Sequence, residues 1–114
     1  MKRVLVVDDE QPVRAVLVEI VRAVGHVAIP SADIANALWL WEADGKSFDV
    51  AIIDYHLTDG FGAALARRLM DEKPALRVIL TSGMTEVNID VPRGVKFLEK
   101  PFTPQALKAL IEAN

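Results

Sequence analysis

Acidic side chains stand directly behind two apolar runs of the chain. The run at residues 4–7 is followed by three acids, which are Asp8, Asp9 and Glu10. A fourth acid, Asp54, ends the apolar run that begins at residue 50. Packing of a core does not require these acids, and carboxylates that gather raise one another's pKa unless positive charge lies among them. Such a cluster suits Mg²⁺, which uses one or two carboxylates together with waters and a phosphate.

Two other polar residues end later apolar runs in the same way. Thr81 follows residues 78–80, and Lys100 lies two residues after residues 95–98. An anion with three oxygens could be bridged by the metal, paired with the ammonium group and hydrogen-bonded by the hydroxyl. The metal would also neutralise charge on an incoming phosphoryl group, so that a carboxylate can act as nucleophile. These residue types therefore predict phosphoryl transfer to a carboxylate.

The elements that must position these side chains alternate between short apolar runs and longer amphipathic segments. We expect strands at residues 4–7, 27–29, 50–53, 78–80 and 95–98. These runs lack the polar alternation of a half-exposed strand, which is typical of a parallel sheet covered on both faces by helices. In such sheets ligands bind outside the carboxyl ends of the strands, where the acids, Thr81 and Lys100 fall.

Helices are predicted between the strands. The first begins near Pro12 and ends at Gly25, because apolar residues recur at helical spacing and both residues suit helix ends. The others are expected at residues 34–43, at residues 62–72, and from residue 104 to the end, with Thr103 as the N-cap. Residues 83–94 show no clean helical period, so a helix there is expected to be short or distorted.

Two tryptophans lie in the second helix. Trp39 and Trp41 cannot both face the core, because residues two apart on a helix diverge by about 200°. Ile34 and Leu38 share a face with Trp41. We therefore expect Trp41 to be buried and Trp39 to be exposed.

Bulk composition narrows the class of protein. The chain has 114 residues, is 52% hydrophobic and contains no cysteine, which predicts one domain over residues 1–114 without disulfides or thiolate metal sites. Its net charge of -3 argues against nucleic acid or an anionic membrane as partner. The first apolar run breaks at Asp8, short of a signal peptide, and no later run could span a bilayer. We expect a cytoplasmic protein.

Four sequence blocks resemble the signature motifs of the response regulator receiver domain of two-component signalling, the CheY-like family. In chain order these blocks are VLVVDDE, VAIIDYHLTDGFG, VILTSG and FLEKPF. The match covers essentially the whole chain, and the four blocks together are specific although each alone is weak. The resemblance implies an α/β, flavodoxin-like, doubly wound sheet of five parallel strands in the order 2-1-3-4-5. It also implies a cis peptide bond between Lys100 and Pro101.

The resemblance implies a role for each site residue. Asp54 would be the phosphoacceptor, Lys100 would bind the phosphoryl group, and Thr81 would be the switch hydroxyl. The Mg²⁺ ligands would be Asp8, Asp9, Asp54 and the backbone carbonyl of His56. Phe97 would be the switch aromatic, with a ring partly in the core that rotates into space vacated by Thr81. The donor would be a sensor histidine kinase or a histidine phosphotransfer protein, and the output a surface for a downstream protein target.

The chain departs from the common family pattern in three places. The mildest is Thr58, which stands where the family often has proline, in a turn that Asp59 and Gly60 still support. The interval from Thr81 to Lys100 is short and lacks a convincing helix, the element that many receivers use to dimerise. We therefore expect at most a weak homodimer. Phe97 has no hydroxyl, so packing rather than a hydrogen bond would have to report the switch.

Other functions fit the residues less well. A flavin site needs a neutral loop after the first strand, and a phosphatase with an aspartate nucleophile needs an acid where His56 stands. The open alternative is a receiver-like docking module that works by protein contact without phosphorylation. We expect no enzyme beyond catalysis of its own phosphorylation and dephosphorylation. A free-standing receiver and a part of a hybrid kinase or longer regulator both fit the sequence.

Overall fold

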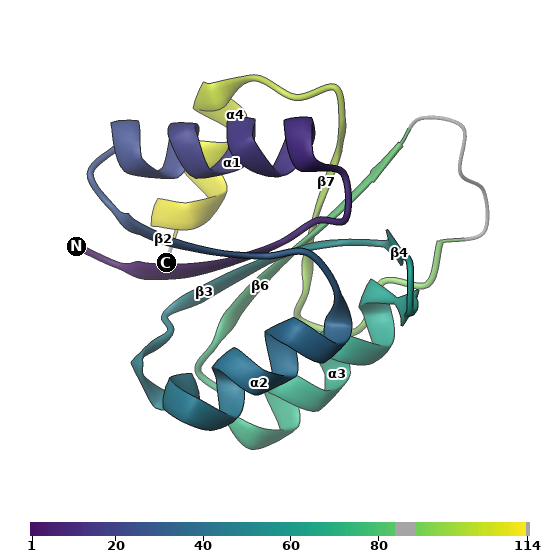
Figure 1. The fold of residues 1–114 in the computed structure, drawn as a ribbon. Helices are drawn as coiled ribbons and strands as arrows, with labels where there is room; N and C mark the ends of the chain where they lie inside the picture. The colour runs from purple at the N-terminus through teal and green to yellow at the C-terminus, as the bar shows by residue number, and fades with distance from the viewer. Residues whose placement is uncertain (84–88, 114) are drawn as a thin grey trace.

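A parallel sheet forms the centre of the computed structural model, which describes residues 1–83 and 89–113. Its strands, in spatial order, are β2 (Val27–Ser31), β1 (Arg3–Val7), β3 (Val50–Asp54), β6 (Arg77–Gly83) and β7 (Lys96–Lys100). Neighbouring strands pair in parallel throughout (Figure 1). Counted along these five strands, the order is 2-1-3-4-5, so the predicted flavodoxin-like fold is confirmed.

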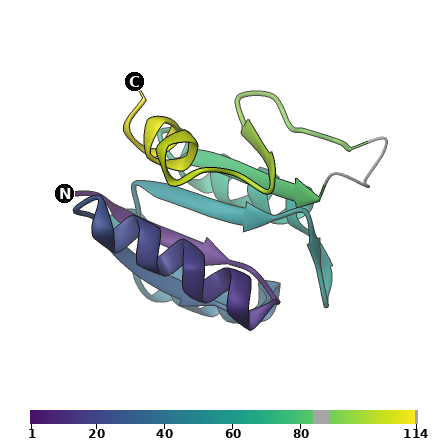
Figure 2. The ribbon, with the colours of Figure 1, turned by 90° about the horizontal axis from the view of Figure 1, so that it is seen from above.

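Helices cover both faces of the sheet. Helices α1 (Gln11–Ala23) and α4 (Pro104–Glu112) lie on one face, and α2 (Ile34–Asp44) and α3 (Gly62–Glu72) lie on the other (Figures 1 and 2). Successive strand residues point to opposite faces, which divides the core into two clusters. Leu5 packs in the cluster of α2 and α3, whereas Val4 and Val6 pack in the cluster of α1 and α4. No helix in the described ranges is long and apolar enough to cross a membrane.

The helix ends follow the sequence signals. The first turn of α1 contains Pro12, and the chain leaves that helix at Gly25 with φ of 93°. The Thr103 hydroxyl accepts the backbone N–H of Ala106 at 3.0 Å, so the predicted cap of the last helix is confirmed. Asp33 caps α2 in the same way by accepting the N–H of Asn36 at 2.7 Å. Each cap satisfies an N–H group that the helix itself leaves without a partner.

The chain that leads into β7 is not helical where the structure describes it. Residues 89–95 contain irregular chain and a turn, with Gly94 at φ of 86°. The expectation of a short or distorted helix at residues 83–94 partly falls on residues 84–88, which lie outside the described residues. Over residues 89–94 no helix is present. The described part of the connection between β6 and β7 therefore adds no helix to the sheet.

Trp41 anchors the second helix to the core. Its side chain is 5% exposed, whereas that of Trp39 is 69% exposed, so the predicted division between the two is confirmed. The indole stacks on Phe48 with ring centroids 6.2 Å apart and donates from Nε1 to Glu72 at 3.1 Å. Burial of the ring with its one polar atom satisfied is the stable arrangement for tryptophan.

The connection from β3 to α3 returns closely over the end of the sheet. It contains a short antiparallel ribbon of β4 (His56–Leu57) and β5 (Gly60–Phe61). The N–H of Gly62 donates to the carbonyl of Tyr55 at 2.7 Å. A Cβ atom at Gly62 would lie 2.1 Å from the carbonyl oxygen of Asp54, which is backbone that cannot swing aside. Glycine is thus needed at this position to let the loop fold back on Asp54.

The substitution Gly62→Ala tests this close approach. We expect it to lower the free energy of unfolding by about 2 kcal/mol or more, since overpacking against backbone forces the chain to shift. Gly83→Ala is the matched control, because a Cβ there meets nothing within 4 Å. Urea unfolding should place Gly83→Ala within about 0.5 kcal/mol of the wild type. Equal stability of the two variants would contradict the tight packing at Gly62.

Candidate functional site

The carboxyl ends of four strands bring the predicted residues to one rim of the sheet. Asp8 follows β1, Asp54 ends β3, Thr81 lies near the end of β6, and Lys100 ends β7. Asp54 and Thr81 are direct partners in the register of β3 and β6. Asp8 extends the pairing of β1 by donating its N–H to the carbonyl of Ser31 at 3.1 Å. The strand order therefore gathers residues that are up to 92 positions apart in the chain.

A partly buried ammonium group joins two carboxylates at this rim. Lys100 Nζ lies 3.2 Å from Asp8 Oδ2 and 3.2 Å from Asp54 Oδ1. Asp8 is fully buried and Asp54 is 6% exposed, so water screens these charges poorly. The peptide bond between Lys100 and Pro101 is cis, as the family resemblance implied. The cation is the partner that allows two acids to be buried side by side.

Asp8 is held in place from several directions. Its Oδ1 accepts the N–H of Glu10 at 2.9 Å while its Oδ2 faces Lys100. Arg14 Nη1 donates to the backbone carbonyl of Asp8 at 2.7 Å. Both the carboxylate and the backbone of Asp8 are thus fixed before any ligand binds.

The acids after β1 form a group of oxygen ligands. One carboxylate oxygen each from Asp8, Asp9 and Glu10 lies within 4.8 Å of the others. The family resemblance implied a different set of metal ligands, which were Asp8, Asp9, Asp54 and the His56 carbonyl. Glu10 is an addition to that set. A donor set made only of oxygens fits a hard cation such as Mg²⁺ and not zinc. The residues present therefore fit the ion that the family resemblance implies.

Thr81 presents a buried hydroxyl that lacks a partner. The residue is fully buried, and its Oγ1 makes no hydrogen bond among the described residues. Its backbone is engaged, since the Thr81 carbonyl accepts the N–H of Tyr55 at 2.8 Å. A buried polar group without a hydrogen bond costs about 1–3 kcal/mol. An oxygen of a bound anion would supply the missing partner.

Phe97 lies further out than the sequence suggested. Its side chain is 37% exposed and packs in neither of the two core clusters, although its neighbour Leu98 packs in the cluster of α1 and α4. Adjacent strand residues point to opposite faces, so Phe97 points to the face of α2 and α3. Residues 89–95, which lead into β7, contribute no helix to that face. The expectation that this ring lies partly in the core is not met for this reason.

Burial and charge set the proton affinities of the two central groups. Burial raises the pKa of Asp54 to about 6. The negative charges of Asp8 and Asp9 also raise this pKa, whereas the positive charge of Lys100 lowers it. For Lys100, burial alone would lower the pKa, but the carboxylates of Asp54 and Asp8 outweigh it and the pKa is raised. The lysine therefore stays charged at neutral pH, while Asp54 is a carboxylate that loses its proton reluctantly.

A model of the family described as response regulator receiver domain matches residues 4–112. The chain belongs to this family. The site residues of this receiver domain lie where the strand ends of the flavodoxin-like sheet converge, so the match in sequence and the geometry agree.

Named relatives of the receiver domain differ in length. The DNA-binding transcriptional regulator NtrC of Azospirillum brasilense is 32% identical over 96% of this chain, which spans only 23% of that protein. A chemotaxis protein CheY homolog of Campylobacter jejuni is 28% identical over 96% of this chain and 89% of its own length. The crystal structure of a response regulator receiver domain protein from Clostridium thermocellum has a TM-score of 0.90. It is 23% identical and covers 97% of this chain and 91% of that one, which supports the fold alone.

Sequence reasoning treated Asp59 only as a turn residue. In the receiver domain its carboxylate accepts the N–H groups of Ile34 and Ala35 at 2.9 and 3.0 Å. The pKa of Asp59 is lowered, chiefly by the bond from Ile34. The loop after Asp54 is thereby tied to the N-terminus of α2, where negative charge also complements the helix dipole. The motif TDG signalled a turn, but it could not show which distant helix the turn would cap.

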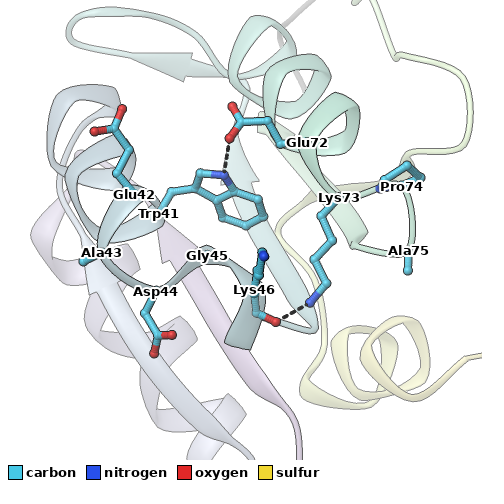
Figure 3. A pocket seen from close by; sticks show the side chains of 10 residues that line it. All are labelled: Trp41, Glu42, Ala43, Asp44, Gly45, Lys46, Glu72, Lys73, Pro74 and Ala75. Atoms are coloured by element: carbon cyan, nitrogen blue, oxygen red, sulfur yellow. Dashed lines mark hydrogen bonds between the residues drawn. The ribbon is translucent and has the colours of Figure 1, made fainter.

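A second hollow, of about 650 Å³, lies between the C-terminal ends of α2 and α3 (Figure 3). Its walls include Trp41, whose Nε1–H is bonded to Glu72. Lys73 Nζ donates to the backbone carbonyls of Lys46, at 2.8 Å, and of Phe48. These groups hold α2, α3 and the intervening turn together. The polar groups of these walls are thus engaged in structural contacts, and the residues that could carry chemistry lie at the rim around Asp54.

The raised pKa of Asp54 predicts a pH-dependent cost in stability. A carboxyl group whose pKa is raised by folding stabilises the fold below its unfolded pKa, and this contribution is lost as pH rises through about 6. Without Mg²⁺ at pH 8, Asp54→Asn should therefore unfold with a free energy about 1–3 kcal/mol higher than the wild type. The difference should close as pH falls from 6 to 4, as measured by urea unfolding at each pH.

A matched control separates this effect from the general loss of a negative charge. Asp71→Asn removes a carboxylate from the exposed surface of α3. It should stay within about 0.5 kcal/mol of the wild type at every pH. An Asp54→Asn variant that is no more stable than the wild type at pH 8 would contradict the electrostatic account of the site.

Proposed function

We propose that this receiver domain accepts a phosphoryl group on Asp54 from a phosphohistidine of a sensor histidine kinase or a histidine phosphotransfer protein. The observation that carries the proposal is the contact of Lys100 Nζ with Asp54 and Asp8, each at 3.2 Å, beside the unpartnered hydroxyl of Thr81. An acceptor carboxylate, a fixed cation and a buried donor are the parts that a three-oxygen anion requires.

Each residue would have a separate role in the reaction. Asp54 would supply the nucleophilic oxygen, in the carboxylate form that prevails above pH 6. Lys100 would pair with one oxygen of the transferred group, and Thr81 would donate its hydroxyl hydrogen to another. Their positions are set by strand pairing, so little reorganisation is needed before transfer.

Magnesium would be held by Asp8, Asp9 and Asp54 together with the backbone carbonyl of His56, and Glu10 lies close enough to assist. The ion would neutralise negative charge where the phosphoryl group and the carboxylates meet. The acidic group supports this proposal because its own repulsion is reduced when a divalent cation binds.

Phosphorylation would change the protein surface on the exposed side of β7. A bond between the Thr81 hydroxyl and a phosphoryl oxygen would shift the end of β6 and open space next to it. Phe97, which is 37% exposed, could then rotate inward without first leaving a core contact. The change in surface would be offered to a downstream protein target. We expect this in the cytoplasm, with at most a weak homodimer and no nucleic acid contact by this domain.

The alternative is a docking module that works without phosphorylation. Such a module has no use for a buried carboxylate whose pKa is raised, or for a buried hydroxyl without a partner. Both features cost stability, and costs of this kind cluster at functional sites. They favour phosphorylation over simple docking.

The domain would catalyse only its own phosphorylation and dephosphorylation. Both a free-standing receiver and a part of a longer protein remain compatible with relatives as different in length as NtrC and the CheY homolog.

Intact mass spectrometry with acetyl phosphate tests the proposal directly. We expect the wild type to gain the mass of one phosphoryl group in millimolar Mg²⁺, and to gain none when the metal is chelated. Asp54→Asn should gain none in either condition because the nucleophile is absent. Asp9→Asn should label more slowly at low Mg²⁺ and recover as the concentration is raised.

Two results would decide against the proposed acceptor. One is a wild type that stays unlabelled although it is folded. The other is a phosphoryl mass that persists in Asp54→Asn, which would place the modification elsewhere. Asp71→Asn is the control for loss of an acidic residue, and it should label like the wild type.

A further inference from the structure

Three aromatic rings touch one another beside the acceptor. The ring centroids of Tyr55 and His56 are 5.1 Å apart, those of His56 and Phe61 are 5.3 Å apart, and those of Tyr55 and Phe61 are 5.9 Å apart. His56 is exposed, and Phe61 is 55% exposed. A single exposed phenylalanine is common on protein surfaces. Here three rings lie in contact at steep angles to one another, which braces the exposed ring of Phe61 against its neighbours.

The backbone under these rings is fixed from several sides. His56 and Phe61 are partners across the antiparallel ribbon of β4 and β5. Leu57 in the same ribbon is only 8% exposed and packs in the core. Asp59 ties the ribbon to the N-terminus of α2 through two hydrogen bonds. The Tyr55 hydroxyl accepts the N–H of Asp90 at 3.1 Å. The rings are thus presented in a set arrangement, which lowers the entropy that binding would cost.

The ribbon begins and ends against the acceptor. Tyr55 and His56 follow Asp54 directly in the chain, and Gly62, next to Phe61, packs against the carbonyl of Asp54. Figure 2 shows the ribbon projecting from the sheet where β3 ends. Any phosphodonor that reaches the Asp54 carboxylate must bring its leaving group to this rim. For a phosphohistidine, that leaving group is an aromatic imidazole.

We propose that Phe61 is a recognition residue for the phosphodonor, stacking on the imidazole ring of the incoming phosphohistidine. This inference rests on the proposed function, because it needs Asp54 to be the acceptor. Aromatic pairs stabilise contacts beyond the area they bury, and stacking orients the ring that departs. Phe61 would thereby favour donors with an imidazole leaving group over donors without a ring.

The transfer itself needs no additional reactant. An oxygen of the Asp54 carboxylate forms a bond to phosphorus, and the bond between phosphorus and the imidazole nitrogen breaks. The electron pair of that bond goes to the nitrogen. A donor ring that carries a proton on its other nitrogen then leaves as neutral imidazole. Phe61 would touch this ring throughout without taking part in bond making.

Two small donors test the inference with the whole chain. Phosphoimidazole carries the ring that Phe61 would recognise, and acetyl phosphate carries none. We expect Phe61→Ala to lower the second-order labelling rate with phosphoimidazole about threefold to tenfold, the range that one aromatic pair supplies. The rate with acetyl phosphate should stay within about twofold of the wild type, and Phe61→Trp should keep the rate with phosphoimidazole. Trp39→Ala, which removes another exposed ring, should change neither rate.

The outcomes separate this inference from the function on which it rests. Equal slowing with both donors in Phe61→Ala would show a general effect on the site and overturn ring recognition. Unchanged rates with both donors would overturn it as well. A wild type that accepts phosphate from neither donor would overturn the proposed function itself. Thermal unfolding of each variant confirms that the compared proteins are folded.

Discussion

The contact of the partly buried Lys100 with the buried acids Asp8 and Asp54 is the interaction on which the rest of the structure depends. Two acids that are almost fully buried share one ammonium group at 3.2 Å from each. A buried ion pair of this kind is weak evidence for stability, because removing charges from water costs much of what their attraction returns. Here burial raises the pKa of Asp54, and the charges of Asp8 and Asp9 add to that effect while Lys100 opposes it. The net negative charge at this rim fits the divalent cation and the acceptor role that we propose for Asp54.

The sheet explains how this arrangement forms. In the order β2-β1-β3-β6-β7, the acids end strands at the centre of the sheet, and Lys100 reaches them from the edge strand. The loop after Asp54 returns over the same rim only because Gly62 has no Cβ, and Asp59 fixes that loop on α2. One short segment therefore supplies the proposed acceptor Asp54, the predicted metal-binding carbonyl of His56 and the aromatic rings around Phe61. These residues lie at one rim because of their positions in the fold, and not because any one of them is unusually reactive.

Much of the fold could be predicted from the sequence because its signals are local. Apolar runs without alternation marked the strands, and the polar residue that ends each run marked the rim, so Asp54 and Thr81 were placed correctly next to each other. Contacts that depend on the path of a loop were not accessible in this way. Asp59 caps the N-terminus of a distant helix, and Phe97 is exposed although it lies within a strand of the sheet. No pattern of residue types encodes these contacts, since each depends on where two separate segments meet.

The central claim is that Lys100 restrains the proton affinity of Asp54, and carbon NMR of labelled aspartate carboxyl groups measures this most directly. A titration without Mg²⁺ should show an Asp54 pKa of about 6 in the wild type. In Lys100→Met the pKa should rise above that value, because burial and the charges of Asp8 and Asp9 then act without opposition. An Asp54 pKa that is the same in both proteins, or that lies near 3.8 in the wild type, would contradict the account.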